Sequence, residues 1–325
     1  MTLDIAAFKS VRVMVIGDLM IDEYLWGDVD RISPEAPVPI VAVKRESYTL
    51  GGAGNVVSNL VAMGAAVSVT GTAGPGPTGE LLLKRFAEIG VDTRGICVEP
   101  DRPTTRKTRV IASNQQVLRI DRETRREISP FTMDTLTRHL EATLPHVDLV
   151  LISDYDKGLV TRSLVAIVAR LAARHSILAI ADPKGLDYTK YSRLNMLTPN
   201  QKEAGMAASI EIFSPADLEK AGRIIMDKAE LERLIITCGK DGMLLFDHQA
   251  PVRHIESEAR QVFDVSGAGD TVIAILGLAL ASGASFLESA ICANAAAGIV
   301  VGKVGTATPT IPELTRALGK TQVSP

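Results

Sequence analysis

The sequence predicts one α/β domain of three layers, α/β/α, with a mostly parallel central sheet and a small β lid. From about residue 130 onward, short β-branched runs alternate with amphipathic segments. That alternation is typical of βαβ units, whose parallel sheet is covered by helices on both faces. No internal repeat, linker or low-complexity segment divides the 325 residues. We therefore expect a single domain over 1–325, with lid segments at about 22–50 and 100–122.

Composition narrows the class of protein. The chain is 46% hydrophobic and 22% charged, with a net charge of −3, so a globular protein is expected and nucleic acid is not an expected partner. Its three cysteines are isolated and odd in number, which favours a reducing cytoplasm over a disulfide framework or a zinc site. The N-terminus lacks a signal-peptide pattern, and the most apolar stretch, 272–281, is too short to cross a bilayer.

The first half of the chain predicts two core strands, two helices and the lid. The expected strands are 11–16 and 67–70, and the expected helices are 56–63 and 78–89, the latter with Gly90 at its C-terminal cap position. Segment 22–50 contains Pro34, Pro37 and Pro39, so short strands and turns outside the main sheet are expected there. Residues 107–112 and 117–121 flank a polar turn and predict a hairpin.

The second half predicts the regular α/β part. The expected strands are 149–153, 177–181, 196–198, 234–237 and 243–247, and the expected helices are 132–144, 162–174, one from about 214, and 272–281. Polar residues follow several strands: Asp18, Asp154, Asp182 and Asn200. Ligands of such sheets bind outside the carboxyl ends of the strands, so these side chains are expected at a binding site.

A glycine-rich turn at 264–271 follows an extended run, 259–265, and precedes the apolar helix. Such a turn leaves backbone N–H groups unpaired at the helix N-terminus, where they favour an anion. Asp270 falls in the first helical turn, where a carboxylate beside an anion site suits proton removal during phosphoryl transfer. The alternative is an ordinary acidic residue stabilised by the helix dipole.

Several other chemistries are disfavoured by missing patterns. The chain has no P-loop; a dinucleotide fingerprint would need glycine where Val57 stands; and Gly-x-Ser-x-Gly does not occur. Asp18, Asp22 and Asn55 could bind vicinal hydroxyls beside Gly51 and Gly52, or serve only turns and caps.

Asn200 and Glu203 lie three residues apart at the start of a possible helical turn. They could hold waters of a Mg²⁺ ion. The same spacing also fits an ordinary helix-capping box, and the sequence leaves both interpretations open.

Four motifs in order resemble the PfkB, or ribokinase-like, family of carbohydrate kinases: the segments 51–66 (GGAGNVVSNLVAMGAA), 198–203 (TPNQKE), 237–242 (TCGKDG) and 264–270 (DVSGAGD). The resemblance covers nearly the whole chain. It implies a ribokinase-like fold, the cofactors ATP and Mg²⁺, and transfer of a phosphoryl group to a sugar. Segment 74–79 (GPGPTG) departs from the family, because the acidic residues usual in this turn are missing.

Further segments resemble the heptose 7-phosphate kinases of this family: 17–24 (GDLMIDEY), 31–39 (RISPEAPVP), 153–158 (SDYDKG) and 182–185 (DPKG). This implies phosphorylation of the anomeric hydroxyl of D-glycero-β-D-manno-heptose 7-phosphate, in the ADP-heptose route to lipopolysaccharide core. Many such kinases carry a C-terminal adenylyltransferase, so a stand-alone form is expected here. The alternatives are a PfkB kinase for another sugar, sugar phosphate or nucleoside, a non-catalytic sugar or nucleotide sensor on the same fold, and, least favoured, a dehydrogenase.

The resemblance also implies roles for individual residues. Asp270 would be the base, and Gly267, Ala268 and Gly269 the anion hole. The sugar would be held by Asp18, Asp22, Gly51, Gly52, Asn55 and Asp154. The nucleotide and Mg²⁺ would be held by Asn200, Glu203, Thr237, Gly239, Gly242, Ser266 and Asn294. Lys107, Arg109, Lys157 and Lys184 are candidates to read the sugar phosphate. The lid would mediate a homodimer, since exposed sheet edges are commonly covered or paired.

Overall fold

A computed structural model describes residues 3–113, 115–259, 262–303 and 305–321. Its main feature is a nine-stranded sheet in the order β13-β12-β11-β10-β9-β8-β1-β4-β5. The strands are β1 (Arg12–Gly17), β4 (Ala66–Ala73), β5 (Asp92–Val98), β8 (Leu149–Ser153), β9 (Leu178–Asp182), β10 (Met196–Leu197), β11 (Arg233–Thr237), β12 (Met243–Asp247) and β13 (Ala250–Ile255). All neighbours from β11 to β5 are parallel, and β12 runs antiparallel to both β11 and β13.

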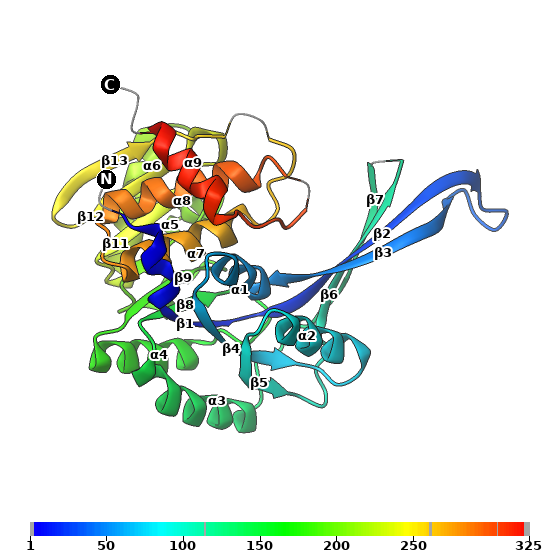
Figure 1. Cartoon of the computed structure of the whole chain (residues 1–325), viewed down its shortest axis with the longest axis horizontal. Coiled ribbons are helices and arrows are strands. Elements are labelled where there is room, and N and C mark those ends of the chain that lie inside the picture. Colours follow the sequence, from blue (N-terminus) through cyan, green and yellow to red (C-terminus); the bar gives the residue numbers. More distant parts are fainter. Residues whose placement is uncertain (1–2, 114, 260–261, 304, 322–325) are drawn as a thin grey trace.

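Helices cover both faces of this sheet (Figure 1). One layer contains α1 (Ala53–Ala62), α2 (Pro77–Glu88), α7 (Ala268–Ala281), α8 (Phe286–Val300) and α9 (Ile311–Thr321). The other contains α3 (Pro130–Thr143), α4 (Arg162–His175), α5 (Gln201–Ala208) and α6 (Pro215–Ala229). Short 3-10 helices are η1 (Ile5–Ser10), η2 (Leu144–His146), η3 (Tyr188–Tyr191) and η4 (Gly239–Asp241).

Successive residues of the central strands pack into opposite layers. In β1, Val13 and Val15 join the core under α1 and α7, whereas Met14 and Ile16 join the core under α3 and α4. Because both faces are buried, such strands are continuous apolar runs, and this is the pattern that predicted them. The predicted three-layer α/β class is confirmed.

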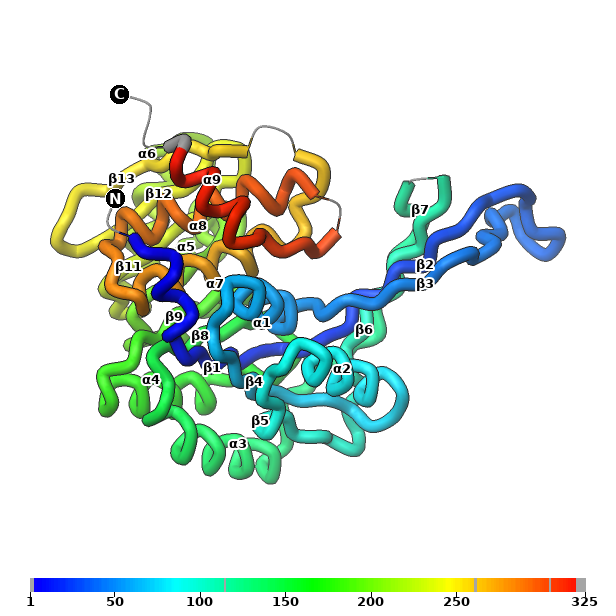
Figure 2. The backbone as a smooth tube through the Cα atoms, viewed as in Figure 1, coloured from blue at the N-terminus to red at the C-terminus, as the bar shows by residue number. Residues whose placement is uncertain are grey.

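The lid is a second sheet of four strands in the order β3-β2-β6-β7. Its strands are β2 (Leu19–Ile32), β3 (Pro39–Gly52), β6 (Thr105–Ala112) and β7 (Gln115–Arg122). The chain leaves the body after β1, runs out along β2, and returns along β3 into α1 (Figure 2). The lid strands β2 and β3 thus connect β1 to α1, the helix that follows the glycines at 51 and 52.

The prediction of short strands and turns for 22–50 is wrong, since β2 and β3 each contain 14 residues. The prolines do not interrupt pairing, because Pro34 and Pro37 lie in the turn at the tip and Pro39 is the first residue of β3. Proline is tolerated at both kinds of position, where its missing N–H is not needed in the ladder.

Other differences concern strands and helices that were not predicted: β5, β13, α8 and α9, together with α5, of which only a possible first turn was expected. A start signal for α8 was present, because Ser285 and Glu288 form a capping box before its apolar run. In the expected extended run 259–265, residues 262–265 form no strand, and 260 and 261 lie outside the described residues. Residue 114 of the predicted hairpin turn is likewise outside them, although β6 and β7 do pair antiparallel.

Candidate active site

The site centres on Asp270 in the first turn of α7, as predicted. Its carboxylate is 3% exposed and is held from two sides. Asn55 Nδ2 donates to Oδ2 at 2.8 Å, and the Tyr155 hydroxyl donates to Oδ1 at 2.8 Å. Gly267 caps the helix with φ of 81°, and a Cβ there would lie 2.4 Å from Asn55 Nδ2. Glycine at 267 therefore allows both the turn and the approach of Asn55.

Burial raises the pKa of Asp270 to about 7, with a further rise from Asp22, against the lowering effect of the hydrogen bonds from Asn55 and Tyr155. A carboxylate with a pKa near neutral is well matched to removing a proton at physiological pH. Asp270 is thus suited to general-base chemistry, and its environment differs from that of a solvated acidic residue at a helix start.

The backbone before Asp270 offers fewer free amides than predicted. The Ala268 N–H already donates to the Val265 carbonyl at 3.2 Å, and the Ser266 N–H donates to Asp264 Oδ1 at 2.9 Å. For the Gly267 and Gly269 N–H groups, no acceptor occurs among the described residues. Of the three predicted amides, these two therefore remain free to receive an anion at the N-terminus of α7.

A cavity opens beside this turn, between the η4 turn and α8. It brings together four residues predicted to bind the nucleotide, Thr237, Gly239, Gly242 and Asn294, with Ala268 and Gly269 of the anion turn. Its other walls are mostly apolar and were not predicted: Met243, Val262, Val265, Val272, Ala297, Gly298 and Val301, with Lys240, Ser257 and Ala259. An apolar slot bordered by a few polar groups suits a planar ring joined to a charged tail.

Asp18 and Asp154, predicted to hold sugar, each bind protein groups. Asp18 Oδ2 accepts the N–H groups of Tyr155 and Lys157 at 2.8 and 3.1 Å, and Oδ1 accepts that of Leu159 at 3.4 Å. Asp154 accepts Lys190 Nζ at 2.5 Å, and it also accepts the Tyr191 hydroxyl and the Asp156 N–H. Burial, and then Asp154, raise the pKa of Asp18 to about 6.

Asp22 acts on the base directly, because its charge raises the pKa of Asp270. Arg109 Nη1 donates to Asp22 Oδ1 at 2.7 Å. A Cβ at residue 51 would lie 2.6 Å from Asp22 Oδ2, so Gly51 lets this carboxylate lie against the backbone. Gly52 precedes α1 as its N-cap residue.

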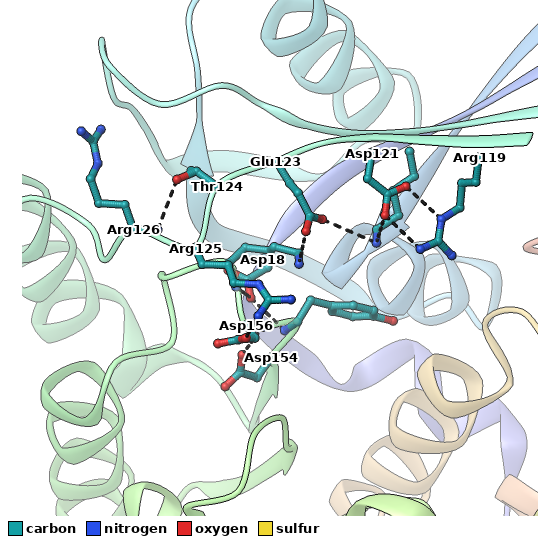
Figure 3. A network of polar contacts seen from close by, with 12 residues as sticks. Asp18, Arg119, Asp121, Glu123, Thr124, Arg125, Arg126, Asp154 and Asp156 are labelled. Carbon is teal, nitrogen blue, oxygen red and sulfur yellow. Dashed lines mark hydrogen bonds and ion pairs between the residues drawn. The ribbon is translucent and has the colours of Figure 1, made fainter.

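Each of the four cations predicted to read a sugar phosphate has a carboxylate partner. Besides the Arg109–Asp22 pair, Lys157 Nζ lies 2.9 Å from Glu123, and Lys184 Nζ lies 2.6 Å from Glu203. Lys107 Nζ lies 3.6 Å from Asp121 and 3.8 Å from Glu123. Figure 3 shows Asp121 and Glu123 in one network with Arg119, near Asp18 and Asp154.

Asn200 and Glu203 form a helix-capping box, which was one of the two interpretations that the sequence left open. Asn200 Oδ1 accepts the Glu203 N–H, and Glu203 Oε2 accepts the Asn200 N–H, both at 3.0 Å. Glu203 Oε1 faces Lys184, and Glu203 is the largest charge effect on Asp182, whose pKa burial raises well above its usual range. Within the described ranges, no group of three His, Cys, Asp or Glu side chains is placed to ligate a metal directly.

Tyr155 is the functional candidate that sequence reasoning missed. The signal available was weak: it lies two residues after β8, at the same strand ends as Asp18 and Asp154. No local pattern indicates that its hydroxyl reaches a residue 115 positions away.

The family is decided by comparison with known proteins. A model described as pfkB family carbohydrate kinase matches residues 11–314. The chain belongs to the pfkB family of carbohydrate kinases. This confirms the expected sugar-kinase class, and the fold is ribokinase-like. The kinase's described residues contain no helix that is both long and apolar enough to traverse a lipid bilayer.

Among similar proteins, the kinase is 53% identical over 311 residues to a bifunctional protein HldE of Desulfatibacillum aliphaticivorans, covering 96% of this chain and 64% of that one. It is 49% identical over 310 residues to the protein of that name in Geobacter sulfurreducens, covering 95% and 63%. The chain thus spans less than two thirds of the length of these relatives.

Solved structures agree on the fold. Phosphofructokinase-2 from Escherichia coli with substrates and products has a TM-score of 0.79 at 20% identity, covering 96% of this chain and 100% of that one. Arabidopsis thaliana ribokinase with ribose and ATP has a TM-score of 0.74 at 18% identity, covering 95% and 98%.

Proposed function

We propose that this kinase transfers the γ-phosphoryl group of ATP to the anomeric hydroxyl of D-glycero-β-D-manno-heptose 7-phosphate, forming the 1,7-bisphosphate, in ADP-heptose synthesis in the cytoplasm. The observation that carries the proposal is the buried Asp270 carboxylate at the N-terminus of α7, beside the cavity lined by Ala268 and Gly269. A positioned base next to an anion-binding helix end is what phosphoryl transfer to a hydroxyl requires.

In this proposal Asp270 accepts the proton of the attacking sugar hydroxyl. Its pKa of about 7 lets it be ionised in a large share of molecules at neutral pH while remaining basic enough to take a proton. The free N–H groups of Gly267 and Gly269, together with the α7 dipole, would offset the negative charge of the phosphoryl group. Asn55 donates to Asp270 and Asp22 acts on its charge, so these two predicted sugar ligands would hold the sugar beside the base.

The residues present fit ATP. The cavity combines apolar walls such as Met243 and Val272 with glycine backbone at 239 and 242, and the Gly269 N–H beside it suits a phosphate oxygen. The nucleotide would supply the phosphoryl group and its leaving group.

The residues present also fit Mg²⁺ held through water. Burial, and then the charges of Glu203 and Asp270, raise the pKa of Asp182, and a bound cation would offset these negative charges. Oxygen ligands and retained waters are what Mg²⁺ prefers. Glu203 and Asn200 would hold the ion's water shell, and the ion would offset charge on the phosphates.

The heptose-phosphate part of the proposal rests on sequence and charge. The segments at 17–24, 31–39, 153–158 and 182–185 resemble heptose 7-phosphate kinases, and the relatives named above share most of this chain. Lys107 and Lys157 converge on Glu123, which gives a cationic pair that could exchange its carboxylate partner for a phosphate.

An ADP-release assay over a panel of acceptors tests the proposal. The panel contains heptose 7-phosphate, the free heptose, ribose, fructose 6-phosphate and a nucleoside. Among these acceptors, we expect the kinase to phosphorylate only heptose 7-phosphate. Turnover on another acceptor would replace the substrate assignment with that of a different PfkB kinase, and ATP binding without turnover on any acceptor would favour a sensor.

The proposal includes a homodimer formed through the lid. The lid exposes apolar side chains on β2, β3 and the turn between them (Ile32, Val38 and Val43) and on β7 (Val117, Leu118 and Ile120). Strand β7 is also the edge of the four-stranded sheet. An exposed apolar edge strand supports pairing with a second copy.

A further inference from the structure

The hydroxyl of Tyr155 is the second donor to the base, and no family motif quoted above assigns it a role. It donates to Asp270 Oδ1 at 2.8 Å, opposite Asn55 on Oδ2. We propose that Tyr155 is a positioning residue that orients the Asp270 carboxylate for proton abstraction and favours its ionised form. The inference rests on the proposed function, in which Asp270 is the base.

Backbone contacts fix the segment that carries Tyr155. The Asp18 carboxylate accepts the N–H groups of Tyr155, Lys157 and Leu159, which pins alternate residues of the segment to the end of β1. Asp156 between them has a φ of 57°. A carboxylate that accepts several backbone N–H groups holds a segment in one conformation at low cost in entropy, because its own side chain is buried.

A buried arginine also binds the backbone of this segment. Arg102 is 5% exposed and is paired with Glu99. It donates to the Lys157 carbonyl at 2.8 Å and to the Arg126 carbonyl at 2.5 Å. The Tyr155 side chain therefore extends from a backbone that both Asp18 and Arg102 bind, which is the support that a precisely positioned side chain needs.

The two hydrogen bonds to Asp270 leave acceptor sites on its carboxylate unused. Each carboxylate oxygen has about two acceptor sites, and one on each oxygen of Asp270 is used, by Asn55 and by Tyr155. Holding both oxygens fixes the plane of the carboxylate, and a remaining acceptor site can receive the sugar hydroxyl. A loss of either donor would let the carboxylate rotate away from the reacting group.

The charges around Asp270 explain why the hydrogen bond from Tyr155 matters for the ionisation of this carboxylate. Two carboxylates face it, Asp22 of β2 and Asp182 of β9, the first paired with Arg109 and the second influenced by Lys184. Burial, and then the charge of Asp22, favour the protonated form of Asp270, whereas the hydrogen bonds from Asn55 and Tyr155 favour its ionised form. Asp270 in turn contributes to the raised pKa of Asp182. Removing the Tyr155 hydroxyl should move proton uptake by the base to higher pH.

The test compares Tyr155→Phe with a matched variant, Tyr188→Phe. The Tyr188 hydroxyl is buried, and among the described residues it has no hydrogen-bond partner. For each protein kcat is measured from about pH 5 to about pH 9, which spans ionisation of the base. We expect the acid limb of Tyr155→Phe to move up by about one pH unit, with kcat near neutral pH about tenfold lower and KM for ATP changed by less than about twofold. Tyr188→Phe should follow the unmodified protein.

Asp270→Asn, assayed in parallel, separates this inference from the proposed function. If Asp270→Asn keeps nearly full activity, the base assignment itself fails. If Asp270→Asn is inactive while the pH profile of Tyr155→Phe superimposes on that of Tyr188→Phe, only the role of Tyr155 is overturned. The positioning role would also be overturned if Tyr155→Phe showed no cooperative thermal unfolding while Tyr188→Phe stayed folded. That result would show that the Tyr155 hydroxyl is needed for folding.

Discussion

Asn55 donates to the Asp270 carboxylate at 2.8 Å although the two residues lie 215 positions apart. One belongs to α1, which follows the glycines at 51 and 52, and the other to α7, which follows the glycine turn at 267. Helices α1 and α7 pack against each other in the same layer. Two glycine-rich stretches that are distant in the sequence therefore form two halves of one site.

Replacing Asp270 by Asn should lower kcat by roughly 10²–10⁴, the usual contribution of a general base. The physical reason is that the amide cannot accept the sugar proton, although it has nearly the same shape. Binding of ATP, measured by calorimetry, should change little. A variant with nearly unchanged kcat would contradict the assignment of Asp270 as the base.

The same variant should alter how stability depends on pH. The pKa of Asp270 rises from 3.8 to about 7 on folding, so the folded protein keeps this proton to higher pH than the unfolded chain. Its contribution to the free energy of unfolding is full below about pH 4 and is lost as pH rises through about 7, a difference of roughly 4 kcal/mol at most. Asp270→Asn should flatten that decline in urea unfolding experiments.

The exposed Asp134 on α3 supplies a matched control, and Asp134→Asn should leave the decline unchanged. An equally steep decline in Asp270→Asn would show that the proton uptake belongs to other groups. Asp18, whose pKa burial also raises, would then be the next group to replace.

Replacing Glu203 by Gln should raise the Mg²⁺ concentration needed for half-maximal rate. Gln can still accept the Asn200 N–H, so the capping box survives, while the negative charge near Asp182 is removed. The matched control is Asp217→Asn, which neutralises the capping box of α6 and should leave the Mg²⁺ profile unchanged. Equal profiles for both variants would favour capping as the whole role of Glu203.

Replacing Lys157 by Ala should raise KM for the sugar phosphate by about tenfold, or roughly 1.4 kcal/mol, with little change in KM for ATP. The substitution removes the Nζ that contacts Glu123 but keeps the backbone N–H and C=O bonded to Asp18 and Arg102. Ala variants of Lys107, Arg109 and Lys184 are compared in the same assay, with Lys44→Ala on the lid as control.

If none of the four site variants changes KM for the sugar, or if the free heptose reacts as well as its 7-phosphate, then the phosphate-reading role is wrong. The kinase would then be assigned to an unphosphorylated sugar.

Replacing Leu118 by Lys should convert a dimer to a monomer in light scattering at micromolar concentration. Leu118 is 53% exposed on the edge strand β7, where a charge opposes strand pairing and apolar contact. Leu186, 67% exposed outside the lid, gives the matched control Leu186→Lys, which should stay dimeric. An unmodified protein that is already monomeric would contradict the lid interface.

Much of the fold was predictable because its signals are local. The buried strands β1, β8 and β9 are short β-branched or apolar runs, and the start of α7 is marked by glycines. Helix α8 was missed because it is apolar or small on nearly every side, as expected of a helix packed between α7 and α9. The lid strands were underestimated because their length comes from pairing between β2 and β3, which prolines at the tip do not disturb.

The sequence by itself determined that Asp270 stands in the first turn of a helix behind a glycine turn, because turn and cap chemistry depend on neighbouring residues. Only the tertiary structure decided which groups meet that carboxylate. Tyr155 and Asn55 reach it from distant segments, Asp18 turns to the backbone of 155–159, and every predicted phosphate-reading cation acquires a carboxylate partner. Hydrogen bonds and ion pairs act over a few ångströms in space, and chain folding alone sets which side chains come within that range.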